Sequence, residues 1–311
     1  MKKQILIKQI SILFLLYILY PLSIAQTVQI EKELLYDTHT LEDTYSYKDG
    51  TRSFQWDKID KLLSQIESFS PSSQWAILQN NKNKNGKPPR VKDGYIDNYH
   101  RFADAYGVEQ YQGVPLYNQD DLSVPERYSF DGALVQVLDQ SDTDFVLVET
   151  VTFPGQWMVP ARYLHLIAPN TAFNKVIVVD RTNQNIVTIE KQEERWIVRS
   201  MNPATTGLQR PPYQMETPLG IFVLQEKKRQ MHYYKDGTTQ IGGFAPYANR
   251  FSGGGYIHGI PVDLPKTKEI ELSSTLGTTP RSHKCVRNAT SHAQFIYNWA
   301  PVDQTIIVVI D

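Results

Sequence analysis

The sequence predicts a mainly β protein that contains a small number of helices. From Gly113 onward, short runs rich in β-branched and aromatic residues recur, and clusters of turn residues such as Asp139 to Asp142 separate them. Apolar residues recur at helical spacing in Ser53 to Phe69 and again in Ala289 to Trp299. The chain has 311 residues, of which 41% are hydrophobic, which is enough for about two domains with buried cores.

Residues 1–25 have the pattern of a secretory signal peptide. Three lysines precede an apolar run that ends at Ile24, and the small residues Ser23 and Ala25 predict cleavage before Gln26. The run is shorter than the about 20 residues that a bilayer span requires, and an uncleaved anchor is the alternative. We expect an exported protein of the periplasm or cell envelope, with no stable membrane insertion after cleavage.

The charge of the chain argues against one class of partner. The predicted signal peptide holds three of the 32 basic residues and none of the 33 acidic residues, so the mature chain carries a net charge of −4. Binding of nucleic acid without sequence preference requires a basic surface. We therefore expect no nucleic-acid partner, and the sequence does not indicate an oligomeric state.

Residues 26–106 are predicted to form an N-terminal region around one amphipathic helix. The polar residues 26–50 show no clear period and are expected to be an extended lead-in. The helix is expected over Ser53 to Phe69, with Ser53 as a possible N-cap. The aromatic-rich stretch Tyr95 to Tyr111 is ambiguous, and a second short helix is one interpretation.

Residues 107–169 are predicted to form a small β-barrel. Several short β-rich runs follow one another here, including Ala133 to Leu138 and Phe145 to Glu149. The run Gly155-Gln156-Trp157-Met158-Val159 leads to a short turn that ends in Tyr163-Leu164, which resembles bacterial SH3-like domains. That resemblance implies a module that holds an enzyme near the cell wall; a structural spacer is the equal alternative.

Residues 170–311 are predicted to be mostly β with one helix. Three β-branched runs with turns between them indicate an antiparallel meander, and a strand follows Thr217-Pro218. The helix over Ala289 to Trp299 could be capped by Asn288 or Thr290. A final strand is expected over Thr305 to Ile310.

Cys285 is the only cysteine and a candidate nucleophile. His283, Lys284 and Arg287 surround it with basic groups, and the predicted helix begins shortly afterwards. Positive charge or a nearby base converts a thiol to the reactive thiolate, and His258 is placed after a short apolar strand where it could act as that base. The alternatives are a buried inert thiol, hydrogen-bonded structural histidines and, for Arg287, a surface ion pair.

These residue types together point to acyl transfer through a thioester. Backbone N–H groups of residues 283–285 could stabilise a tetrahedral intermediate. The planar guanidinium of Arg287 suits a carboxylate, so a substrate with a free carboxylate near the reacting carbonyl would fit.

The order of four motifs resembles the L,D-transpeptidase (YkuD-type) family over roughly residues 171–311. The motifs are Thr217-Pro218-Leu219-Gly220, Ile257-His258-Gly259, Leu276-Gly277 and Ser282-His283-x-Cys285-Val286-Arg287. The resemblance implies a β-sandwich with one helix after the catalytic cysteine, and an enzyme that needs no metal or cofactor.

The resemblance also implies a role for each site residue. Cys285 is the nucleophile, His258 the general base, the carbonyl of Gly259 orients that base, and His283 lines the oxyanion region. Ser282, Lys284 and Arg287 fall in the substrate-binding part of the motif. Such enzymes attack the third residue of a peptidoglycan stem tetrapeptide, release the terminal D-alanine, and pass the acyl group to an amine or to water.

Two features depart from the family pattern. Lys284 stands where the family has glycine, so a left-handed backbone there would be strained, or the ammonium lowers the thiol pKa. The interval from His258 to His283 is longer than usual, which predicts an insertion over the site at about Asp263 to Ser274.

Other interpretations explain fewer of these observations. Papain-like peptidases usually place the cysteine before the histidine, and sortases have a longer interval between His and Cys. A zinc site at His258, His283 and Cys285 lacks a tight ligand pair. A catalytically inactive or merely hydrolytic peptidoglycan-binding protein of the same fold is the main alternative.

Overall fold

The structure, a computed structural model, describes residues 28–311, so the predicted signal peptide lies outside the described residues. The described chain is mainly β, and its α-helices are α1 (Trp56–Glu67) and α2 (Thr290–Trp299). The predicted fold class is thus confirmed. No helix among residues 28–311 has both the length and the apolar character needed to span a membrane.

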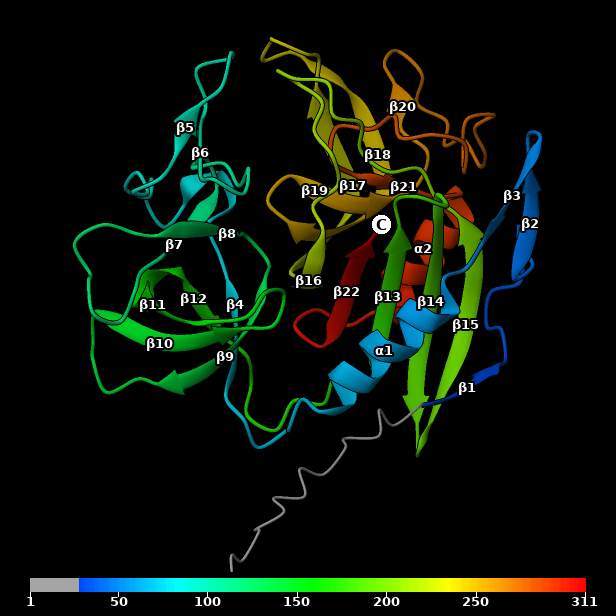
Figure 1. Cartoon of the computed structure of the whole chain (residues 1–311). Helices are drawn as coiled ribbons and strands as arrows, with labels where there is room; N and C mark the ends of the chain where they lie inside the picture. Colours follow the sequence, from blue (N-terminus) through cyan, green and yellow to red (C-terminus); the bar gives the residue numbers. More distant parts are fainter. Residues whose placement is uncertain (1–27) are drawn as a thin grey trace, which may run out of the picture.

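A six-stranded sheet forms the centre of the larger part of the molecule (Figure 1). Its order is β1 (Gln29–Lys32), β15 (Arg195–Pro203), β14 (Asn185–Gln192), β13 (Lys175–Asp180), β22 (Thr305–Ile310) and β16 (Gly220–Val223). The predicted antiparallel meander is β13, β14 and β15, and the predicted final strand is β22, which runs parallel to β13. Residues 26–50 are predicted to be an extended lead-in, but they include β1, which pairs in parallel with β15.

A second sheet packs against one face of this sheet. It contains β17 (Glu226–Tyr234), β18 (Ile241–Ser252), β19 (Gly255–His258) and β21 (Val286–Arg287), and β20 (Val262–Asp263) pairs with β18. Residues of both sheets and of α2 share one core, while α1 covers the opposite face of the six-stranded sheet. The central strands β13 and β22 of the six-stranded sheet are buried on both faces, which explains their continuous apolar runs.

A smaller five-stranded sheet lies to the left in Figure 1. Its order is β11 (Gln156–Pro160), β10 (Phe145–Thr150), β9 (Leu134–Asp139), β4 (Trp75–Leu78) and β12 (Leu164–Leu166). Strand β7 (Gly113–Leu116) contributes to its core and pairs with β8 (Arg127–Phe130). The short 3₁₀ turns of this part of the chain are η1 (Asn81–Asn83) and η2 (Ala161–Tyr163). The sheet includes β4, which precedes the predicted start at residue 107; the SH3-like assignment stays a prediction.

The expected helix within Tyr95 to Tyr111 is wrong. This stretch forms a hairpin of β5 (Tyr95–Ile96) and β6 (Phe102–Ala103). The side chain of Asp97 accepts the backbone N–H groups of Tyr99 and Arg101, at 2.8 and 2.9 Å, which stabilises a turn instead of a helix.

The expected helix caps are also wrong. Ser53 ends strand β3 (Gly50–Ser53), which pairs with β2 (Thr44–Tyr47), and α1 begins three residues later after Gln55. Neither Asn288 nor Thr290 caps α2 by its side chain, since Ala289 holds the N-cap position and makes no side-chain bond. The hydroxyl of Thr290 instead donates to the carbonyl of Ile270 at 2.6 Å.

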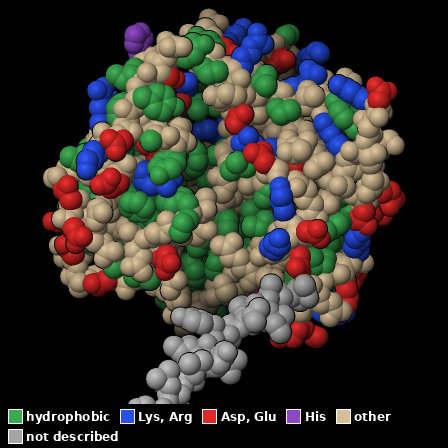
Figure 2. Space-filling model, in the orientation of Figure 1, with side chains coloured by type: hydrophobic (Ala, Val, Ile, Leu, Met, Phe, Trp, Pro, Cys, Tyr) green, Lys and Arg blue, Asp and Glu red, His purple; other side chains and the backbone are tan. Residues whose placement is uncertain are grey.

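The face shown in Figure 2 carries interspersed basic and acidic side chains rather than one large patch of either sign. This distribution agrees with the small negative charge of the sequence and offers no basic surface on that face.

Asp131, which is 2% exposed, joins the small sheet to the second sheet of the sandwich. Its Oδ1 accepts the backbone N–H groups of Asn80 and Asn81, at 2.7 and 2.8 Å. Its Oδ2 accepts a bond from the Arg250 guanidinium and another from the N–H of Gly253, both at 2.8 Å. A buried carboxylate with this many charge-assisted bonds orients the two parts of the chain against each other.

We therefore predict that Asp131→Ala lowers the free energy of unfolding by roughly 3 kcal/mol, because Arg250 and several N–H groups lose a buried partner. Urea denaturation of the mature chain measures this loss. The exposed Asp139→Ala is the control and should cost less than about 1 kcal/mol. Equal losses for the two variants would contradict the role of Asp131.

Candidate active site

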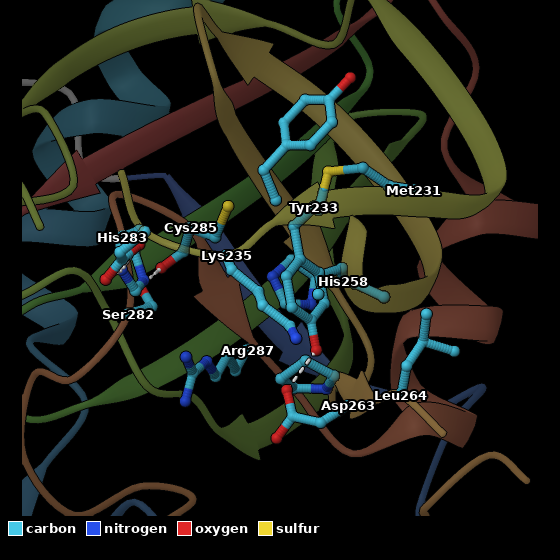
Figure 3. A pocket seen from close by; sticks show the side chains of 15 residues that line it. Met231, Tyr233, Lys235, His258, Asp263, Leu264, Ser282, His283, Cys285 and Arg287 are labelled. Atoms are coloured by element: carbon cyan, nitrogen blue, oxygen red, sulfur yellow. Dashed lines mark hydrogen bonds and ion pairs between the residues drawn. The ribbon is translucent and has the colours of Figure 1, made fainter. Parts of the chain in front are cut away.

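A cavity of about 610 Å³ lies beside the β17–β18 hairpin and contains the predicted nucleophile and base. Figure 3 shows Cys285, His258 and Arg287 around this cavity. It is lined by Met231, Tyr233, Tyr234, Lys235, Asp236, Gly242, Ala245, His258, Pro261, Asp263, Leu264, Ser282, His283, Cys285 and Arg287.

The parallel pairing of β19 with β21 brings these residues together. His258 is the register partner of Arg287, and Ile257 is the partner of Val286. Side chains alternate along a strand, so Cys285 and Arg287 project to the same side, as does His258. Residues 27 positions apart in the chain (Cys285 and His258) therefore face one cavity.

His258 is 4% exposed and is suited to be a neutral base. Its Nδ1 lies 2.6 Å from the carbonyl oxygen of Gly259, which can only accept, so Nδ1 carries the proton and Nε2 is left with a lone pair. Burial lowers the pKa of His258 to about 4, although the bond to Gly259 opposes this effect. The imidazole is therefore neutral at pH 7.

The Cys285 thiol is 8% exposed and is protonated in the free protein at neutral pH. Burial raises its pKa, and the nearby charges of Arg287 and Lys284 offset this effect only in part. Its Sγ donates to the carbonyl of Gly254 at 3.5 Å. A thiol in this environment requires a base before it can attack.

The other predicted residues occupy different parts of the wall. Ser282 is buried, and its hydroxyl donates to the carbonyl of Cys285, which ties the loop that carries the thiol. His283 lies at the exposed edge, where its Nε2 is 3.1 Å from the Asp236 carboxylate.

Arg287 projects its guanidinium into the cavity from a firmly held backbone. Its N–H donates to the carbonyl of Thr205, and its own carbonyl accepts from Thr205, both at 2.9 Å. Burial lowers the pKa of Arg287, and its Nε is buried without a hydrogen-bond partner among residues 28–311. An unpartnered buried donor favours an incoming acceptor such as a carboxylate.

Lys284 does not line this cavity, unlike its neighbours. Its backbone has φ of +82°, the left-handed region in which glycine is unstrained and lysine is not. The loop is held in this conformation by Thr217, whose hydroxyl donates to the Lys284 carbonyl at 2.9 Å and accepts from the N–H of Gly207 at 2.8 Å. Thr217 belongs to the Thr-Pro-Leu-Gly motif, so that motif supports the loop that carries Cys285.

Sequence reasoning missed Tyr233 and Asp263, which also line the cavity. The hydroxyl of Tyr233 donates to the Asp263 carboxylate at 2.6 Å, and burial together with this bond raises the pKa of Tyr233. Asp263 and Leu264 begin the predicted insertion and do line the cavity. The period-2 placement of Met231 and Tyr233 on β17 is the one signal that pointed to a common face.

No group of three or more His, Cys, Asp or Glu side chains suited to a metal ion occurs in the part of the chain that the structure describes. The zinc alternative therefore has no ligand cluster at Cys285 within that part.

The family resemblance is confirmed over the C-terminal part of the chain. Residues 174–310 match the model of the YkuD family, described as the L,D-transpeptidase catalytic domain. The match is confined to this part of the chain. No curated protein matches the chain by sequence.

Solved structures show more distant similarity. An L,D-transpeptidase from Mycobacterium smegmatis shares 16% identity over 58% of this chain and 93% of its own, with a TM-score of 0.36. One from Mycobacterium tuberculosis H37Rv shares 17% identity over 59% and 92%, with a TM-score of 0.35. A Clostridium acetobutylicum protein described as a fused Zn-dependent amidase/peptidase/peptidoglycan-binding domain-containing protein shares 21% over 45% of this chain, with a TM-score of 0.33. The match spans only 53% of that protein, and TM-scores this low assign no function.

We predict that alkylation of Cys285 by iodoacetamide is slow at pH 7 and accelerates beyond pH 9, because burial raises the pKa of the thiol above its usual value. His258 is already neutral above about pH 4, so it should add no inflection between pH 5 and 8. Mass spectrometry of the alkylated chain gives the rates. A rate that levels off below pH 8 would instead indicate a stable thiolate.

Proposed function

We propose that this chain is an exported L,D-transpeptidase-like acyltransferase that acts on peptidoglycan stem tetrapeptides through a thioester on Cys285. The observation that supports this proposal best is the shared cavity, into which β19 and β21 direct His258, Cys285 and Arg287. The family match over residues 174–310 makes a cell-wall peptide the substrate class to test.

In the proposed first step, Nε2 of His258 takes the proton of the Cys285 thiol as Sγ attacks the carbonyl carbon of the third stem residue. A C–S bond forms, and the C–N bond to the terminal D-alanine breaks. The proton on His258 passes to the leaving amine, which departs as D-alanine. The bond from Nδ1 to the Gly259 carbonyl keeps the imidazole in the tautomer that this transfer requires.

Arg287 and the loop around Cys285 have supporting roles in this proposal. The Arg287 guanidinium would bind a stem-peptide carboxylate, which satisfies its unpartnered buried Nε. The backbone of residues 283–285 and the side chain of His283 would stabilise the tetrahedral oxyanion, and Ser282 holds the loop in place.

In the proposed second step, an amine or a water molecule attacks the thioester, and the thiol regains its proton. An amine on another stem gives a cross-link, while water gives hydrolysis. Asp263 and Tyr233 form another part of the cavity wall, where an acceptor could enter.

The remaining parts of the chain complete the proposal. Residues 1–25 would direct export and be removed, which places residues 26–311 in the periplasm or cell envelope. The small sheet would be an SH3-like module within residues 107–169, joined at its N-terminal side by β4, and the catalytic domain would cover residues 170–311.

Incubation of the mature chain with a disaccharide-tetrapeptide, followed by mass spectrometry, tests the proposal. We expect release of D-alanine, an acyl adduct on Cys285 and a cross-linked or hydrolysed product. Cys285→Ala should abolish all three, and His258→Gln should slow D-alanine release by about 10²-fold or more, because it removes the base.

His232→Gln provides the matched control. His232 lies on β17 but is exposed and does not line the cavity, so its replacement should leave the rate within about twofold of the parent. Absence of D-alanine release, adduct and product from the parent chain would reject the enzymatic proposal and favour a peptidoglycan-binding protein of the same fold.

A further inference from the structure

A second cleft, of about 550 Å³, lies behind the catalytic loop. It separates the β5–β6 hairpin from the segment of residues 209–219, and Lys284 contributes to its wall. A smaller cavity of about 260 Å³ is also lined by Lys284, with Arg101, Glu109 and Met215 common to both. Lys284 lines both of these spaces but not the cavity of Cys285, so the catalytic loop has a different ligand-accessible space on each side.

Lys284 is directed to the second cleft by its backbone. With φ of +82°, residue 284 points its side chain away from that of Cys285, although the two residues are adjacent. A lysine at a left-handed position is strained where a glycine would not be. Strained backbone conformations cluster at functional sites, so the side chain of Lys284 is a candidate for a functional role.

The ammonium of Lys284 is the cationic group of this cleft that has no ion-pair partner. Arg101 is paired with Asp97 at 2.7 Å and with Glu109 at 2.8 Å. Arg181 is paired with Glu216 at 2.9 Å. Among residues 28–311, no carboxylate lies within 4.0 Å of the Lys284 ammonium, and no side chain accepts a hydrogen bond from it.

Because the Lys284 ammonium is partly buried, the absence of an ion-pair partner costs free energy. Burial lowers the pKa of Lys284, with Glu109 and Asp131 opposing the effect from a distance. Every carboxylate that lines the cleft is already paired with an arginine. An anion from outside the chain would therefore form the ion pair that the Lys284 ammonium lacks.

The other wall of the cleft offers aromatic surface. Tyr95, Tyr99 and Tyr106 line it and are 50%, 47% and 69% exposed. Tyrosine rings present a broad apolar face and a polar hydroxyl, which suits the packing of a peptide next to its charged end. A bare inorganic anion would leave this surface unused.

We propose that this cleft binds a carboxylate-bearing peptide, with the carboxylate on Lys284 and the peptide body on the tyrosines. Resting on the proposed function, we identify that peptide as a second stem peptide, separate from the one that reacts at Cys285. The cleft then holds a neighbouring stem against the catalytic loop while the first stem occupies the Cys285 cavity.

Titration of the ¹⁵N-labelled mature Cys285→Ala chain with a stem tetrapeptide, followed by NMR, tests this proposal. Cys285→Ala prevents turnover. We expect two groups of amide shifts, one around Tyr233 and Leu264 and one around Tyr99 and Gly107. The tetrapeptide with an amidated C-terminus, and acetate alone, distinguish the sources of the carboxylate: a peptide site loses affinity with either probe.

Adding Lys284→Met should weaken the second group of shifts about tenfold or more, because it removes the ammonium and keeps the side-chain length. Tyr99→Ala, on the exposed hairpin, should weaken the same group without any change in the catalytic loop. Lys92→Met is the matched control, since Lys92 is exposed and lines neither space. Preservation of the first group in Tyr99→Ala and Lys92→Met shows that the chain is folded.

Shifts confined to the Cys285 cavity, or a second group that is unaffected by both Lys284→Met and Tyr99→Ala, would overturn this proposal. Its failure is distinct from failure of the proposed function. D-alanine release without a second group of shifts rejects the cleft alone, whereas a second group without D-alanine release rejects the enzymatic activity alone.

Discussion

The parallel pairing of β19 with β21 is the interaction on which the candidate site depends. It places His258 beside Arg287, and strand alternation then puts Cys285 on the same side. Both strands are short, so their position is secured by neighbours: Arg287 exchanges two backbone bonds with Thr205, and the N–H of Asn288 donates to the carbonyl of His258 at 2.9 Å. The backbone pairing of the second sheet thus fixes the positions from which the side chains of the site project.

The electrostatics of the site follow from burial. Burial keeps the His258 imidazole neutral and the Cys285 thiol protonated, and it leaves the Arg287 guanidinium with an unpartnered Nε. The free protein therefore holds a poised neutral pair rather than a thiolate–imidazolium pair. A carboxylate that pairs with Arg287 would satisfy this buried donor.

Lys284 links this site to the rest of the molecule. The sequence left two readings of its departure from glycine, namely a strained loop or an ammonium that lowers the thiol pKa. The structure shows both effects at once: φ is +82°, and the charge of Lys284 lowers the pKa of Cys285, though by less than burial raises it. The ammonium nevertheless lies in the second cleft, on the far side of the loop from the Cys285 cavity. The β5–β6 hairpin thereby contributes a wall next to the loop that carries Cys285.

The sequence by itself determined the mainly β class, the helix that ends at Trp299, the strand of residues 305–310 and the family of the C-terminal part, because continuous apolar runs and motif order are local properties. It also identified Cys285, His258 and Arg287 as site candidates. Only the tertiary structure decided that Tyr233 and Asp263 meet in the wall of the cavity, that β4 joins the small sheet, and that Lys284 faces a second cleft. Each of these depends on contacts between distant segments, or on a backbone angle, and neither leaves a periodic signal. The helix expected near Tyr95 is absent for a local reason. The aromatic residues there have no helical period, and the hydrogen bonds accepted by Asp97 stabilise a turn.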